Sequence, residues 1–148
     1  MTMNRRKFLA TFCLSSLAGS LGASLLAGCG SLPVVRAPIV GSELVVPLTE
    51  FPRPGTPGGS STVHLLVHND RLEYPVCIYR DGGDRYHALW MQCTHQGTEL
   101  QVIGDRIECT AHGSLFDRRG TVLQGPASTN LRSFPVHVDL DHVRVSLR

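Results

Sequence analysis

This 148-residue sequence has little lysine and no motif for stand-alone catalysis. Lys7 is its one lysine, and after Cys29 the chain carries 11 arginines against 12 acidic residues. This near balance gives no support to nucleic-acid binding, so we expect no nucleic-acid partner. No phosphate-binding loop or nucleophile–base pair is present. The sequence therefore does not predict a stand-alone catalyst.

Helical periodicity is also absent after residue 40. Short apolar and β-branched segments occur instead, separated by Gly- and Asp-containing turn signals. We expect strands at 44–46, 63–68, 76–79, 86–91, 136–140 and 143–147. The sequence thus predicts an all-β domain over residues 42–148, built from short antiparallel strands as a sandwich or barrel.

Residues 1–28 have a different character from the rest of the chain. The basic stretch Arg5–Lys7 precedes a weakly apolar run at 8–27 that contains no acidic residue. This order resembles the twin-arginine export signal of bacteria. The resemblance implies a signal peptide over residues 1–28 and a periplasmic location for the domain that follows.

The sequence 26–29, Leu-Ala-Gly-Cys, resembles the lipobox of bacterial lipoproteins. The resemblance implies that Cys29 is lipidated and that residues 29–41 are a tether. The alternative is that the run at 8–27, about long enough to cross a bilayer, stays uncleaved as a membrane helix. Both alternatives predict a domain anchored to a membrane by its N-terminal segment.

Disulfide partners are missing, although an exported protein would favour them. Cys13 lies in the predicted signal and Cys29 at the predicted lipid site, while Cys93 and Cys109 have the spacing of metal ligands. Cys77 is then left alone. A small exported domain without a disulfide needs another stabilising element, which a bound metal centre could supply.

Two short motifs each offer one thiol and one imidazole. Cys93-Thr94-His95 is followed, after thirteen residues, by Cys109-Thr110-Ala111-His112. A turn at 104–105 would fold the intervening segment on itself and place Cys109 opposite Leu100. The two motifs would then meet at one end of the domain. The candidate metal ligands are Cys93, His95, Cys109 and His112.

These ligand types could hold a structural zinc ion. Zinc sites usually pair like ligands within one loop, however, whereas each loop here mixes a cysteine with a histidine. The mixed order, with Gly97, Gly113 and the sequence 125–127 (Gly-Pro-Ala) around it, resembles the Rieske motif C-x-H…C-x-x-H. The resemblance implies a 2Fe-2S cluster with cysteines on one iron and histidines on the other. A zinc-stapled β-sandwich binding module is the alternative.

The resemblance also implies a fold and several roles for individual residues. The fold is a Rieske-like antiparallel β-sandwich with a cluster-binding subdomain formed by two loops. Ser114 matches a serine that hydrogen-bonds a bridging sulfide, and Phe116 stands where high-potential members carry a hydrogen-bonding tyrosine. Thr98 and Ala111 occupy the positions of two further cysteines in respiratory members. These departures predict a disulfide-free site of intermediate potential.

The function implied is one-electron transfer at the outer face of a bacterial membrane, as a free carrier or a subunit of a respiratory oxidoreductase. Its partners would be redox proteins, and quinol in the alternative of a quinol-oxidising iron-sulfur subunit of a cytochrome bc-type complex. Ring-hydroxylating oxygenases also contain Rieske domains, but they add a domain with a mononuclear iron site. The 148 residues leave no length for one, so we do not expect an oxygenase.

Overall fold

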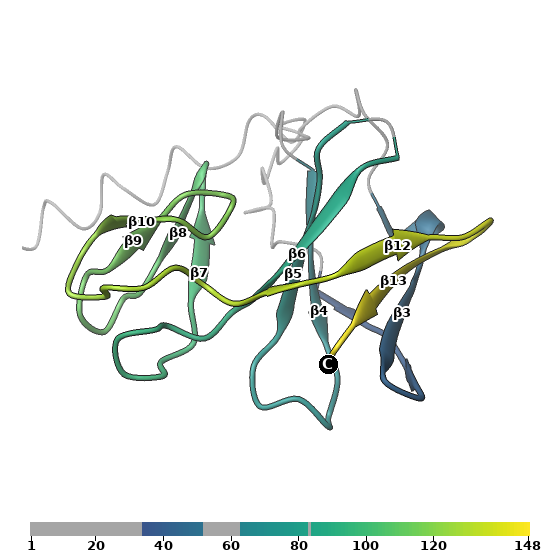
Figure 1. The fold of residues 1–148 in the computed structure, drawn as a ribbon, viewed down its shortest axis with the longest axis horizontal. Coiled ribbons are helices and arrows are strands. Elements are labelled where there is room, and N and C mark those ends of the chain that lie inside the picture. Colours follow the sequence, from purple (N-terminus) through teal and green to yellow (C-terminus); the bar gives the residue numbers. More distant parts are fainter. Residues whose placement is uncertain (1–33, 52–62, 83) are drawn as a thin grey trace, which may run out of the picture. The chain divides into compact units, whose positions relative to one another are not determined.

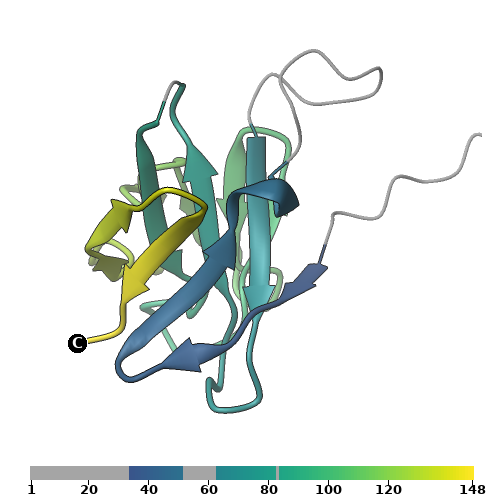
Figure 2. The same cartoon turned by 90° about the vertical axis from the view of Figure 1, so that its right-hand side faces the viewer.

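The computed structural model describes residues 34–51, 63–82 and 84–148. Within these ranges the regular structure is β-strand apart from one short 3-10 helix, η1 (Leu48–Glu50). The strands form three sheets (Figures 1 and 2). In these residues no helix is long and apolar enough to span a bilayer. The predicted export signal and Cys29 lie outside the described residues.

The central sheet has five strands in the order β1-β4-β5-β6-β11. Its neighbours pair antiparallel, except that β1 runs parallel to β4. The strands are β1 (Val34–Arg36), β4 (Val63–His68), β5 (Val76–Arg80), β6 (Tyr86–Trp90) and β11 (Ser133–Phe134). This sheet is buried on both faces at β5, where four successive residues are inaccessible.

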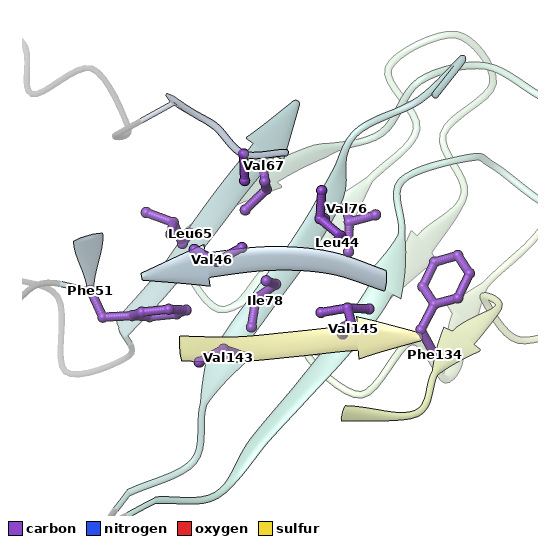
Figure 3. Packing of buried hydrophobic residues seen from close by; sticks show 12 residues of the cluster. Leu44, Val46, Phe51, Leu65, Val67, Val76, Ile78, Phe134, Val143 and Val145 are labelled. Carbon is purple, nitrogen blue, oxygen red and sulfur yellow. The ribbon is translucent and has the colours of Figure 1, made fainter. Parts of the chain in front are cut away.

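A second, antiparallel sheet covers one face of the central sheet. Its order is β12-β13-β3-β2. The strands are β12 (Val136–Val138), β13 (His142–Ser146), β3 (Glu43–Pro47) and β2 (Ile39–Val40). Side chains from both sheets interdigitate in a first apolar core, which includes Leu44, Val46, Leu65, Ile78 and Val143 (Figure 3).

The other face of the central sheet packs against a third sheet of order β10-β9-β8-β7. Its strands are β7 (Gln101–Ile103), β8 (Arg106–Glu108), β9 (Leu115–Phe116) and β10 (Val122–Gln124). Alternation along β5 explains the two cores, since Val76 and Ile78 enter the first while Cys77 and Tyr79 enter the second. The third sheet carries the second predicted ligand motif between β8 and β9, so it corresponds to the subdomain that the sequence predicts to hold the metal centre.

The expected all-β class and sandwich are confirmed. The strand expected at 63–68 has the same bounds in the structure, and the other expected strands differ by one or two residues at one or both ends. Residues 34–40, which belong to the predicted tether at 29–41, instead contain β1 and β2. The parallel pairing of β1 with β4 also departs from the expected antiparallel arrangement.

Candidate metal centre

The β7–β8 hairpin brings the two ligand motifs together. Gln101 pairs with Glu108 across its antiparallel ladder, so the register places the next residues, Leu100 and Cys109, opposite each other. The turn lies at 104–105, where Gly104 has a φ of 60°. The expectation that this hairpin would unite the motifs at one end of the domain is confirmed.

The first loop is closed by its own backbone. The Cys93 N–H donates to the Thr98 carbonyl at 2.8 Å, and the Gly97 N–H donates to the Cys93 carbonyl at 2.9 Å. Gly97 has a φ of 75°, which side chains with a Cβ rarely adopt. The cysteine is thereby held at the start of a tight turn that carries His95 at its bend.

The second loop repeats this pattern sixteen positions later in the sequence. The Cys109 N–H donates to the Ser114 carbonyl at 2.9 Å, and the Gly113 N–H donates to the Cys109 carbonyl at 2.8 Å. Gly113 has a φ of 77°. Two loops of the same backbone design therefore present one cysteine and one histidine each.

The two thiols are buried and the two imidazoles lie nearer the surface. Cys93 and Cys109 are 2% and 1% exposed, and none of the cysteines in the described residues forms a disulfide. The rings of His95 and His112 lie with centroids 4.9 Å apart and planes at 87°. The structure thus brings the two predicted histidine ligands together and buries the two predicted cysteine ligands in one core.

His95 carries the observation that tests whether a metal centre fits here. Its Nδ1 atom is buried and has no hydrogen-bond partner. A buried polar atom without a partner costs free energy, and coordination to a metal would satisfy this one. Two buried thiols and two imidazoles are the donor set of a Rieske 2Fe-2S cluster, so the residues present fit that group.

No three His, Cys, Asp or Glu side chains in the described ranges converge as a site for a single ion. The two imidazoles lie against each other and the two thiols lie in one buried core, so each pair of like ligands draws one member from each loop.

Ser114 links the second loop to the segment 125–127. It is the one buried polar residue in the described part of the chain, at 0% exposure. Its Oγ atom accepts a hydrogen bond from the Ala127 N–H at 3.0 Å. A hydroxyl can accept one hydrogen bond and donate another, so the Ser114 proton remains available to a further acceptor.

Two further hydrogen bonds fasten the segment after β9 to the loops. The Thr94 Oγ1 donates to the Thr129 carbonyl at 2.7 Å, and the Gln124 Nε2 donates to the Gly113 carbonyl at 3.3 Å. Sequence reasoning missed both, because side chain to backbone bonds between distant residues leave no periodic signal. They connect each ligand loop to the covering segment without a disulfide.

The two ligand-loop thiols pack within the second core. Phe116 is fully buried in this core together with both ligand-loop cysteines, Cys77 and Met91. Desolvation by burial raises the pKa of the Cys77 thiol to about 12. Cys77 is therefore a protonated apolar side chain of this core, as the sequence suggested.

The fold and the paired loops define a class, that of small β proteins with a two-loop iron-sulfur site. The model of the Rieske 2Fe-2S domain family matches residues 59–135, which is just over half of the chain. The chain belongs to this family, so it binds one 2Fe-2S cluster per subunit and works in electron transfer.

Known proteins of two kinds resemble the chain. It is 34% identical over 80 residues to the iron-sulfur subunit of the toluene-4-sulfonate monooxygenase system of Comamonas testosteroni, covering 48% of this chain and 23% of that one. It is 26% identical over 139 residues to the cytochrome b6-f complex iron-sulfur subunit of Chlorobaculum tepidum, covering 90% and 73%.

A solved structure shows the same fold. A chain in the complex of reduced oxygenase and oxidized ferredoxin in carbazole 1,9a-dioxygenase aligns with a TM-score of 0.50 and 28% identity, covering 72% of this chain and 94% of that one. The family match favours the cluster over the zinc alternative. Because the chain spans less than a quarter of the monooxygenase subunit, that similarity is confined to one domain.

Proposed function

We propose that this protein is a one-electron carrier or electron-transfer subunit whose cluster is held by Cys93, His95, Cys109 and His112. The buried, unpartnered Nδ1 of His95, on the same loop as buried Cys93, carries this assignment. The bound cluster supplies reversible one-electron chemistry. The chain contributes the paired loops that hold it, the second core that excludes water from the thiols, and Ser114 as a hydrogen-bond donor beside it.

Mutation of a loop cysteine tests the ligand assignment. Purified wild-type protein should be red-brown, with the rhombic reduced-state EPR signal of mixed cysteine and histidine ligation. Cys109→Ser should lose the signal and the iron, whereas Cys77→Ser, which alters an equally buried thiol outside the loops, should keep both. A colourless wild-type protein with stoichiometric zinc would reject the proposal.

The arrangement of donors supports an intermediate reduction potential. Hydrogen bonds to the sulfur atoms stabilise the more negative reduced cluster and raise the potential. Ser114 can donate one such bond, whereas Phe116 has no hydroxyl to donate another. We therefore place the potential within the Rieske range of about −150 to +300 mV, below its upper end. Protein-film voltammetry of the holoprotein measures it directly.

We further propose that the domain works at the periplasmic side of a bacterial membrane, exported by the twin-arginine route and lipidated at Cys29. The motifs at 5–9 and 26–29 support this proposal. In a host with this export route, Cys29→Ser should abolish incorporation of labelled palmitate. If the wild-type chain takes up no label but stays in the membrane fraction, the run at 8–27 is the anchor instead.

A second candidate role is that of a quinol-oxidising subunit of a cytochrome bc-type complex. The similarity to a cytochrome b6-f iron-sulfur subunit over 90% of the chain favours it. The absence of cysteines at Thr98 and Ala111 favours the free carrier. Detergent-solubilised membranes distinguish the two roles, since only the subunit should co-purify with b-type haem in constant ratio.

A further inference from the structure

The two ligand loops differ in what packs against their glycines. A Cβ at Gly97 would lie 3.4 Å from the Gln92 Nε2 and 3.8 Å from the Tyr74 hydroxyl, so both polar groups lie against the bare side of this glycine. Among the described residues, nothing lies within 4 Å of the same point at Gly113. The first loop is therefore supported on a side where the second loop is open.

Gln92 lies at the base of the first loop, directly before Cys93. It pairs with Glu99 in an isolated antiparallel bridge that closes the loop. Its Oε1 accepts a hydrogen bond from the Trp90 Nε1 at 3.0 Å. An indole nitrogen can only donate, so this bond fixes the orientation of the amide. The amide NH₂ group is thereby directed toward Tyr74 and the loop.

Tyr74 continues this series of hydrogen bonds. Its hydroxyl interacts with the Gln92 side chain and with the Glu73 carboxylate. A carboxylate can only accept, so the Tyr74 proton goes to Glu73 and the Tyr74 oxygen accepts from the Gln92 amide. Desolvation and the Glu73 charge raise the pKa of Tyr74, so its hydroxyl stays protonated. Each donor in the series from Trp90 to Tyr74 thus has an acceptor.

The same side chains connect the first loop to the first apolar core. The Tyr74 and Trp90 rings meet edge to face with centroids 5.9 Å apart, and Trp90 meets Phe134 in the same way at 5.8 Å. Phe134 belongs to the first core, and Trp90 packs against it. The first loop is therefore joined to the first core by side chains, although the cysteines of both loops lie in the second core.

We propose that Tyr74 and Gln92 are positioning residues, which clamp the first ligand loop and thereby fix the orientation of the His95 ring as a cluster ligand. Gly97, which they contact, lies two residues after His95 in the same tight turn, so a displacement of Gly97 moves the ring. Groups behind a metal ligand set its orientation, and their loss commonly weakens the site. The inference rests on the proposed function, because it assumes that His95 binds the cluster.

Removal of single polar groups tests the clamp. Tyr74→Phe keeps the ring contact with Trp90 and loses both hydrogen bonds, whereas Gln92→Met loses the amide at similar side-chain length. Tyr86→Phe is the matched control, because it removes a hydroxyl at the opposite end of β6 from Trp90. Backbone hydrogen exchange of the full-length holoproteins, read by mass spectrometry, compares the peptides of the two ligand loops. Pulsed EPR of the reduced cluster compares the nitrogen couplings of the two histidines.

Tyr74→Phe should speed exchange in the first loop about tenfold, because the loop opens more easily without these hydrogen bonds. Exchange in the second loop should not change. One histidine nitrogen coupling should shift and the other should match wild type. Gln92→Met should give the same pattern, and the double variant should exceed neither single variant, since the two residues act as one unit. Tyr86→Phe should match wild type in both measurements.

Two results would overturn the inference while the cluster function stands. One is that both single variants match wild type, or that exchange rises equally in the two loops. The other is faster exchange in the first loop with unchanged nitrogen couplings, which would reduce Tyr74 and Gln92 to structural contacts without an effect on the ligand. Absence of the cluster signal in wild type would overturn the proposed function and the inference together.

Discussion

The two ligand loops share one backbone design but differ in their surroundings. In each, the cysteine N–H donates to the carbonyl five residues later, and a glycine four residues later donates back. The first loop keeps the Nδ1 of His95 buried, whereas His112 in the second is exposed. The first loop ends in half-buried Thr98 and the second in fully buried Ser114.

The shared and the unshared features correspond to two requirements of the site, which are to hold the cluster and to set its redox properties. The shared hydrogen bonds fix both thiols under the surface, which is a requirement of holding the cluster. We expect the unshared features to set its properties, because the hydroxyl of Ser114 and the exposed ring of His112 both belong to the second loop. We infer that the second loop tunes the site and opens it to the partner, while the first serves mainly to hold it.

The largest expected effect concerns the thiol reactivity of Cys77, the buried cysteine that lies outside the two ligand loops. The pKa of Cys77 is raised to about 12 by burial, against 9.0 for the unperturbed thiol. At pH 8 its thiolate fraction should be about a thousandfold lower in the folded protein than in urea. Maleimide labelling of the holoprotein, read by mass spectrometry, should leave Cys77 unmodified until the chain unfolds.

The same shift predicts a loss of stability at high pH. Between pH 9 and about 12 the unfolded chain releases the Cys77 proton and the folded chain keeps it, so the free energy of unfolding falls as the pH rises. Cys77→Ala should make this part of the profile less steep, while Tyr79 and Tyr86, whose pKa values burial also raises, keep part of the slope. Rapid labelling of Cys77 in the folded protein at pH 8 would contradict both expectations.

A matched glycine pair tests whether the two backbones are equivalent. Gly97→Ala and Gly113→Ala each force a Cβ into the left-handed region, at a cost of about 1–2 kcal/mol. A Cβ at Gly97 would be in ordinary contact with the Gln92 Nε2 at 3.4 Å, and one at Gly113 meets nothing within 4 Å. Urea unfolding of the holoproteins should therefore show similar losses for the two variants. A clearly larger loss for one of them would show that the two loop backbones are not equivalent.

Much of this site could be predicted from the sequence, because its parts are local. The motifs, the glycines and the turn at 104–105 are enough to predict that both loops lie at one end of a hairpin. The strands β9 and β11 have only two residues each. Such strands form because a neighbour pairs with them, so no periodicity reveals them. Bonds such as Thr94 to Thr129 depend on the assembled fold in the same way.

Ser114 and Thr98, which end the second and first loops, test whether the second loop alone tunes the reduction potential. Ser114→Ala should lower the reduction potential by about 60 mV if the hydroxyl favours the reduced state by about 1.4 kcal/mol. Thr98→Val, which removes the hydroxyl at the same place in the first loop, should change it little. Protein-film voltammetry compares the two variants with wild type. Equal shifts for both would mean that the loops tune the site jointly.

The smallest expected effect adds a donor to the second loop. Phe116 is fully buried in the same core as Cys109, and Phe116→Tyr would place a hydroxyl there. We expect the potential to rise by a few tens of mV, because the new hydrogen bond would be partly offset by the strain of one extra atom in a packed core. Phe134→Tyr, which adds the same atom to the first core, should leave the potential unchanged. A fall or no change for Phe116→Tyr would show that the second loop already has the donors it can use, and tuning would then rest on Ser114 alone.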